Sequence, residues 1–267
     1  MKKNEKELIF DLLKKANAHL MGFTSDAFKS QVCFEDDKAE ETRPSTGSGT
    51  ADTISGTADT NSVTTDINSG TTNTSSGAAD NLTLSELYSK ISRCTKCQLA
   101  RTRNNVVPGE GVENPDVLVI GEGPGYEEDM SGRPFVGKAG ILLDKMLAAI
   151  GLDRNKNCYI ANIVKCRPPQ NRDPQPEEEA SCNPFLQAQI HILKPKIILC
   201  MGRIAGHKML ETQEPLNKLR GQFFDYNGIP LMITYHPSAL LRDESLKAPA
   251  WQDLKMFKKK MDEITGK

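Results

Sequence analysis

The stretch V-L-V-I-G-E-G-P-G, residues 117–125, indicates the fold class, because an apolar strand runs directly into a glycine-rich turn. Its first four residues are all aliphatic, which is typical of a strand buried on both faces. The three glycines that follow let the backbone approach a ligand closely. The spacing does not fit a dinucleotide fingerprint, since the third glycine is misplaced and a proline interrupts the turn.

The rest of the folded part repeats this alternation of strand and helix. Three more short apolar runs with β-type composition lie at residues 159–164, 197–201 and 231–235. Helical apolar patterns lie before, between and after them, at residues 84–91, 139–150, 173–193, 204–210 and 251–264. Strands that alternate with helices predict a parallel sheet covered on both faces. Ligands of such sheets bind beyond the carboxyl ends of the strands.

The first 81 residues differ from this pattern. Residues 1–81 are acidic on balance, and residues 1–42 form an N-terminal arm in which residues 5–20 carry the spacing of a short amphipathic helix. Residues 43–81 are rich in Ser, Thr, Gly and Asp and repeat the motif S-G-T-A-D-T, so we expect a disordered linker that buries too little apolar surface to fold. The folded domain is predicted at residues 82–267. The sequence does not choose between partner docking and disorder for the arm, and its partner is unknown.

Several classes of protein are disfavoured by composition. No apolar run has the roughly 18–20 residues that a membrane helix needs, and the acidic residues near the start do not suit a signal peptide. Seven cysteines without an export signal suit thiols or metal ligands better than disulfides. We therefore expect a cytoplasmic protein with no membrane partner. An acidic arm on a mildly basic body is also found in proteins that bind nucleic acid.

Four of the cysteines are candidates for a metal centre. Cys94 and Cys97 form a C-x2-C pair, and Cys166 and Cys182 follow among charged and proline residues. Four thiolates can hold either a structural zinc ion or a four-iron cluster. The spacing by itself does not separate these two metals. In either case the metal would tie together segments that are distant in sequence.

Several motifs together resemble the family 4 uracil-DNA glycosylases, the iron–sulfur type. The motifs are C-x2-C, G-E-G-P-G-x-x-E-D, G-R-P-F-V-G, N-I-V-K-C-R-P-P-x-N-R and H-P-S, which occur in the family's order within residues 84–264. The resemblance implies a three-layer α/β/α domain with a central four-stranded parallel sheet. It implies a monomeric, monofunctional hydrolase that flips deoxyuridine out of DNA, releases uracil and leaves an abasic site for base excision repair.

The resemblance also decides the metal and the uracil pocket. It implies a 4Fe-4S cluster on Cys94, Cys97, Cys166 and Cys182. Asn162 would distinguish uracil from cytosine through its amide, and His236 would donate a hydrogen bond to uracil O2 as negative charge develops. Phe135 would stack on the base. The remaining pocket residues would be Gly121, Glu122 and Gly123.

The catalytic and DNA-contacting residues follow from the same resemblance. Asn171 would position the attacking water, with Glu122 or Glu128 as an electrostatic helper. The family usually has alanine where this chain has Gly123, and a glycine supplies no general base. The segment after His236 is expected to form a loop that enters the minor groove. Its DNA-contacting residues would be Ser238, Leu240, Leu241 and Arg242.

Two other functions remain open at this point. One is a glycosylase for a broader range of deaminated bases such as hypoxanthine or xanthine, which the Gly123 substitution keeps open. The other is a metal-stapled DNA-binding protein without catalysis. Asn162, Asn171 and His236 are all present, and a protein that only binds DNA would not need all three.

Overall fold

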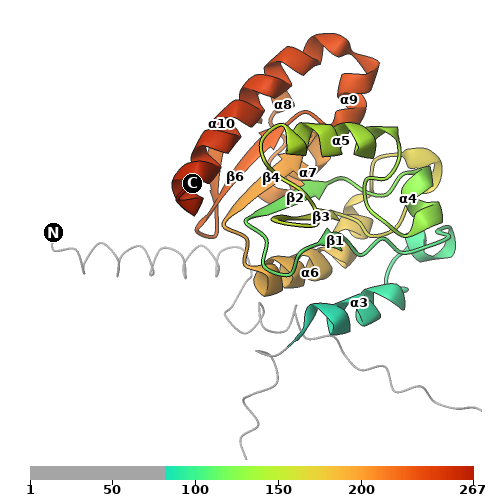
Figure 1. Cartoon of the computed structure of the whole chain (residues 1–267). Helices are drawn as coiled ribbons and strands as arrows, with labels where there is room; N and C mark the ends of the chain where they lie inside the picture. The colour runs from blue at the N-terminus through green and yellow to red at the C-terminus, as the bar shows by residue number, and fades with distance from the viewer. Residues whose placement is uncertain (1–81) are drawn as a thin grey trace, which may run out of the picture.

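The computed structural model describes residues 82–267, which is the predicted folded domain (Figure 1). The predictions for residues 1–42 and 43–81 lie outside the described residues. The described domain is built around one mixed sheet of six strands in the order β1-β3-β2-β4-β6-β5. The strands are β1 (Glu110–Gly111), β2 (Val117–Gly121), β3 (Cys158–Asn162), β4 (Ile197–Met201), β5 (Phe223–Tyr226) and β6 (Ile229–Thr234).

The four central strands are parallel, as the sequence predicts. β2 pairs with both β3 and β4, and β4 pairs with β6. Every residue of β2, β3 and β4 is buried, which explains why their sequences are apolar without alternation. The register places Gly121 opposite Asn162, and Met201 opposite Thr234. The carboxyl ends of the strands therefore meet at one edge.

The prediction of four strands is wrong in number, because an antiparallel strand is added at each edge. β1 is only two residues long and pairs with β3. β5 pairs with β6 through a tight turn in which Asn227 and Gly228 both have positive φ, 52° and 86°. An Asn-Gly pair between two β-type runs is a strong hairpin signal, so β5 was readable from the sequence.

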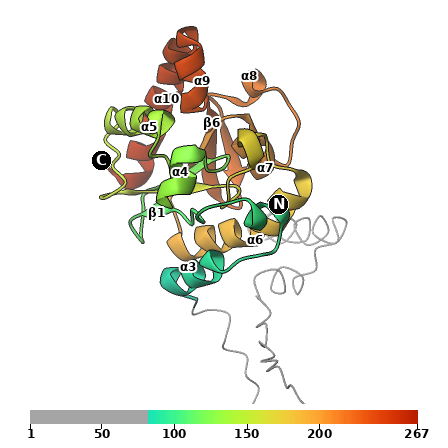
Figure 2. The same cartoon turned by 90° about the vertical axis from the view of Figure 1, so that its right-hand side faces the viewer.

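Helices cover both faces of the sheet, which confirms the three layers (Figures 1 and 2). The α-helices are α3 (Leu84–Ser92), α4 (Tyr126–Ser131), α5 (Lys138–Ala148), α6 (Pro176–Leu193), α7 (Arg203–Leu210), α8 (Leu216–Leu219), α9 (Pro237–Arg242) and α10 (Lys247–Thr265). Short 3-10 turns lie at Gln98–Arg101, Pro169–Asn171 and Glu244–Leu246.

Alternate side chains of the central strands feed two separate cores. Leu118 and Ile120 of β2 pack in a core with α3 and α6, whereas Val117 and Val119 pack in a core with α5 and α10. Burial of this apolar surface is the main force that stabilises the domain. No helix in residues 82–267 combines the length and apolar character needed to cross a bilayer.

One connection after a strand differs from the prediction. The expected loop after His236 is the helix α9, which Pro237 begins at its first position, where proline fits because no N–H is needed. The acidic residues after Gly125 form the first turn of another short helix, α4. Acidic side chains at a helix start are stabilised by the helix dipole. Both short helices lie at the carboxyl edge of the sheet.

Candidate active site

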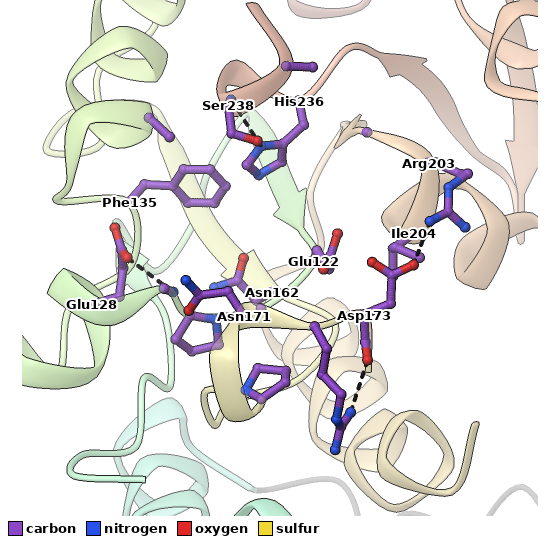
Figure 3. A pocket seen from close by; sticks show the side chains of 18 of the residues that line it. Glu122, Glu128, Phe135, Asn162, Asn171, Asp173, Arg203, Ile204, His236 and Ser238 are labelled. Atoms are coloured by element: carbon purple, nitrogen blue, oxygen red, sulfur yellow. Dashed lines mark hydrogen bonds and ion pairs between the residues drawn. The ribbon is translucent and has the colours of Figure 1, made fainter. Parts of the chain in front are cut away.

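A cavity of about 500 Å³ lies beyond the carboxyl ends of all four parallel strands. Each strand contributes to its wall, through Glu122 after β2, Asn162 at the end of β3, Gly202 after β4 and His236 after β6. Figure 3 shows Glu122, Asn162 and His236 around one hollow, together with Phe135 and Asn171. The structure thus brings together five of the predicted site residues, at the edge where an open α/β sheet binds ligands.

Asn162 presents an unused acceptor in this cavity. Its side chain is 2% exposed, and among the described residues its Oδ1 is the buried side-chain oxygen or nitrogen that has no hydrogen-bond partner. Its main-chain carbonyl accepts a hydrogen bond of 2.7 Å from the buried Lys165 ammonium, which fixes the strand end. A buried acceptor without a partner costs free energy, so a ligand with an N–H donor would bind there favourably.

Gly121 makes room for this arrangement. A Cβ on Gly121 would lie 2.5 Å from Asn162 Oδ1 and 2.5 Å from the Phe135 ring. Glycine is therefore required here by close packing. Gly121 is itself buried and is not among the residues that line the cavity, so its predicted contact with uracil stays a prediction.

Phe135 is held in a left-handed backbone conformation, with φ of 51°, and its ring is buried at the wall of the cavity. Two buried contacts hold this conformation. The Arg154 guanidinium donates to the carbonyl oxygens of Pro134, at 2.9 Å, and Phe135, at 3.0 Å. Gly140 lies so close that a Cβ there would be 2.0 Å from the Phe135 carbonyl. The strained backbone thus fixes a flat aromatic face toward the cavity.

Glu128 is a brace between two loops. Its Oε1 accepts from the backbone N–H groups of Val136, at 2.8 Å, and Gly137, at 2.9 Å. Its Oε2 accepts from the N–H of Gly125, at 3.1 Å. Both carboxylate oxygens are therefore engaged in holding the Phe135 loop against the glycine-rich turn. Of the two helpers considered from the sequence, only Glu122 has a carboxylate available to the cavity.

His236 is a neutral hydrogen-bond donor toward the cavity. Burial, followed by the charge of Arg242, lowers the pKa of its imidazole to about 4. Its Nδ1 accepts from the backbone N–H of Ser238, so the proton of the neutral ring is on Nε2. The ring lies 5.6 Å from that of Phe135, centroid to centroid. Gly202 permits this placement, since a Cβ there would lie 2.8 Å from the His236 Cβ.

Glu122 has an unusual ionisation. Burial, followed by repulsion from Asp173, raises the pKa of its carboxyl to about 7. Arg203 opposes this shift, but it is itself paired with Asp173 at 2.5 Å. A carboxyl group with a pKa near neutrality in a cavity is a candidate for acid–base or electrostatic catalysis. Alanine in place of the next residue, Gly123, would be crowded, because its Cβ would lie 2.8 Å from Val164 Cγ2.

Asn171 lies on a tight turn at the cavity rim. Both Gln170 and Asn171 have φ of 55°, a conformation that is uncommon for residues other than glycine. The Asn171 Oδ1 accepts a hydrogen bond of 2.8 Å from Arg167 Nε. Asn171 faces the same hollow as Glu122 and Asn162 in Figure 3.

Helix α9 presents one of its two leucines to solvent. Leu241 is 49% exposed, whereas Leu240 is 2% exposed and belongs to the interior. Ser238 and Arg242 both line the cavity. Of the two predicted wedge residues, only Leu241 is available to DNA in this conformation. The helical turn decides this, because successive residues of a helix point in different directions.

The four candidate metal-binding cysteines lie in one region. Cys166 and Cys182 are buried in the core that α3 and α6 share, and Cys94 and Cys97 pack against it. Burial raises the pKa of the Cys166 thiol, and Arg103 donates a hydrogen bond of 3.2 Å to its Sγ. Burial raises the pKa of Cys182 to about 12. Within residues 82–267, no three His, Cys, Asp or Glu side chains are close enough to hold a single metal ion.

Sequence reasoning missed several residues that build the site. The roles of Arg154, Gly140 and Gly202 depend on contacts with segments that are distant in sequence, so no local motif marks these residues. Tyr126 and Arg203 lie in helices that begin directly after a strand and its turn. The sequence signal that could have identified them is their position at the carboxyl edge of the sheet, where ligands bind.

Comparison with known proteins places this site in a family. Residues 108–255 match the model of the uracil DNA glycosylase superfamily. The chain is 46% identical to the Type-4 uracil-DNA glycosylase of Thermotoga maritima over 61% of this chain and 85% of that protein. It is 42% identical to that of Pyrobaculum aerophilum over 66% and 93%, and 37% identical to that of Archaeoglobus fulgidus over 69% and 94%.

Proposed function

The chain belongs to the uracil DNA glycosylase superfamily, and from this membership we propose that it hydrolyses the N-glycosidic bond of deoxyuridine in DNA. The products are free uracil and an abasic site, the first step of base excision repair. The relatives named Type-4 uracil-DNA glycosylase support this activity.

The unpartnered Oδ1 of Asn162 is the observation that carries this proposal. It is a buried acceptor at the base of the cavity, and uracil N3 carries the N–H that would satisfy it. The amide NH2 group of the same side chain would donate to uracil O4. Cytosine has an acceptor at N3 and an amino group at C4, so both contacts would be lost. The base must be flipped out of the helix to reach this depth, with Phe135 as its stacking surface.

His236 would stabilise the leaving group. As the bond between C1′ and N1 breaks, its electron pair goes to the base, and negative charge develops on uracil O2. The Nε2–H of the neutral His236 ring would donate to that oxygen more strongly in the transition state than in the ground state. Because the ring is already neutral and already held by Ser238, no proton has to move before the bond breaks.

Water completes the reaction on the sugar. Its oxygen forms the new bond to C1′ of the oxocarbenium-like sugar while one of its protons passes to solvent, and the uracil anion takes up a proton from solvent. We place Asn171 as the residue that positions this water, and Glu122 as the carboxylate that stabilises the positive charge and the departing proton. A placed water matters more than a strong base when the bond breaks early. This assignment needs no covalent lysine intermediate, so the DNA strand stays intact.

The ionisation of Glu122 predicts a pH dependence. With a pKa of about 7, Glu122 is mostly neutral at pH 6 and mostly ionised at pH 8. If the carboxylate assists the reaction, kcat/KM rises about tenfold over this range, while His236 stays neutral throughout. Glu122→Gln is expected to have a low, flat profile between these pH values. The same inflection near pH 7 in the Gln variant would contradict this role.

Helix α9 would contact the DNA. Leu241 would fill the gap that the flipped base leaves, with Arg242 and Ser238 on the phosphates beside it. Leu240 is buried, so it would hold α9 against the interior of the domain and would not contact DNA. The placement of α9 at the mouth of the cavity supports this arrangement.

We further propose that Cys94, Cys97, Cys166 and Cys182 hold a 4Fe-4S cluster. Their common place in or against the core that α3 and α6 share supports one shared centre, and a four-iron cluster is larger than an ion, so its thiolates lie farther apart. When bound, the cluster would cross-link α3, α6 and the segment after β3. The chemistry of base removal stays with the cavity residues.

The cluster proposal predicts iron loss with a loss of stability. Anaerobically purified protein is expected to contain about four iron and four sulfide ions per chain, and Cys182→Ser is expected to lose iron and to unfold at a lower temperature. Cys200→Ser is the matched control for iron content, because Cys200 is a buried cysteine of β4 that is not among the four predicted ligands. Iron-free protein from anaerobic, iron-replete cells would contradict the cluster.

The substrate range tests the proposed function against its alternatives. Duplexes with a single deoxyuridine, deoxyinosine or deoxyxanthosine are incubated with the protein, and the released bases are identified. Uracil alone is the expected product, with strand cleavage only after alkali treatment. Release of hypoxanthine or xanthine at comparable rates would favour the broader glycosylase, and no release of any base would leave a DNA-binding protein.

A further inference from the structure

Arg167 makes two contacts that join the turn after β2 to the turn after β3. Its Nε donates to Asn171 Oδ1 at 2.8 Å. Its guanidinium carbon lies 5.2 Å from the centroid of the Tyr126 ring, within the range of a cation–π contact. Tyr126 begins α4 directly after the glycine-rich turn. The three residues therefore form a bridge between these two turns, and of the three Asn171 lines the cavity.

The first contact fixes which end of the Asn171 amide faces the cavity. A guanidinium has only N–H donors, so the atom that it contacts must be the amide oxygen. The NH2 group of Asn171 is then left for other partners. Since Asn171 is exposed, its side chain would rotate among rotamers without such a contact. Among the described residues, Arg167 is the side chain that restrains it.

The second contact fixes Arg167 in turn. A long, half-buried arginine has many rotamers, and one exposed hydrogen bond contributes little toward choosing among them. Stacking on the flat face of an aromatic ring restricts the guanidinium to one plane. Tyr126 is 54% exposed, and the structure gives its ring no other aromatic or cationic neighbour in residues 82–267. Its position is thus explained by Arg167.

We propose that Arg167 is a positioning residue for Asn171, and that Tyr126 braces Arg167. The pair presents the Asn171 NH2 group to the attacking water in a single orientation. This inference rests on the proposed function, because it assumes that Asn171 places water for the hydrolysis of deoxyuridine. It assigns Arg167 an effect on the chemical step, which differs from a contact with DNA phosphate.

A phosphate contact and a positioning role predict different kinetics. Loss of a phosphate contact weakens DNA binding and leaves the maximal rate unchanged, and its effect adds to that of any Asn171 variant. Loss of positioning lowers the maximal single-turnover rate with DNA affinity almost unchanged. Its effect also disappears once the Asn171 amide is absent, since nothing is left to position.

The test is a double-mutant cycle under single-turnover conditions on a duplex with one deoxyuridine. Arg167→Lys keeps the charge and is expected to lower the maximal rate about tenfold, or about 1.4 kcal/mol, with less than about a twofold change in the Kd for DNA. Combined with Asn171→Ala, it is expected to cause no further loss. Lys156→Ala, an exposed lysine before β3 at the opposite edge of the sheet, is the charge control.

Tyr126 provides an independent arm of the same experiment. Tyr126→Phe keeps the aromatic face and is expected to retain the wild-type rate, whereas Tyr126→Leu is expected to lose rate in the same way as Arg167→Lys. Full additivity of Arg167→Lys with Asn171→Ala, or a loss confined to DNA affinity, would overturn the inference. Wild-type protein that releases no uracil would instead overturn the proposed function, and an unaffected Asn171→Ala variant would overturn the water assignment and the inference together.

Discussion

His236→Ala is expected to slow uracil release about 10²–10³-fold at saturating DNA, the usual cost of removing one preorganised donor to a developing oxyanion. The expectation follows from the neutral, half-buried ring, whose Nδ1 accepts from the Ser238 N–H and whose Nε2 proton is free for uracil O2. The effect should appear in kcat, because the charge on O2 develops only as the bond breaks. Single-turnover rates measured at neutral pH provide the comparison.

Two controls separate this effect from damage to the fold. His191→Ala removes an exposed histidine from the last turn of α6, which leads into the amino end of β4, and should leave the rate unchanged. Thermal unfolding of the His236 variant should show a folded domain, since the backbone of α9 and its Pro237 start are kept. A rate for His236→Ala within about twofold of the wild type would remove His236 from the mechanism.

Asn162→Ala is expected to lower kcat/KM for deoxyuridine about 100-fold, or about 2.7 kcal/mol, because uracil N3–H and O4 would be buried without partners. The discrimination between uracil and cytosine should shrink at the same time, since the alanine variant no longer favours either hydrogen-bonding pattern. The backbone contact from Lys165 does not depend on the side chain, so the strand end should stay in place.

The measurement for this variant is a competition between duplexes that carry one deoxyuridine or one deoxycytidine. Asn155→Ala, an exposed asparagine before β3 at the amino edge of the sheet, is the matched control. A variant at Asn162 that keeps full activity and full discrimination would show that another group recognises the base.

The central parallel strands could be predicted because a strand that is buried on both faces has a continuous apolar sequence. β2 and β4 match their apolar runs in full, since no polar residue interrupts a strand that has no solvent face. The edge strands lack such a continuous apolar sequence. β5 is half exposed and β1 has only two residues, so their pairing depends on the Asn227-Gly228 turn and on the neighbouring strand rather than on hydrophobicity.

The site residues that belong to a sequence motif could be predicted, but the contacts that depend on tertiary packing could not. Phe135, Asn162 and His236 follow from motifs and meet in the cavity. The left-handed backbone of Phe135 depends on the absence of a side chain at Gly140 and on Arg154, and neither dependence is local in sequence. Likewise, the sequence gives Leu240 and Leu241 the same weight, and only the turn of α9 separates a buried side chain from an exposed one.

The most direct test is the release of free uracil from a duplex with one deoxyuridine, measured for the wild type and for a variant that combines Asn162→Ala with His236→Ala. The account predicts that the wild type releases uracil and leaves an intact strand with one abasic site, and that the double variant, though folded, releases almost none. Equal release by both proteins would show that base removal takes place without this cavity, and no release by iron-replete wild type would contradict the proposed activity itself.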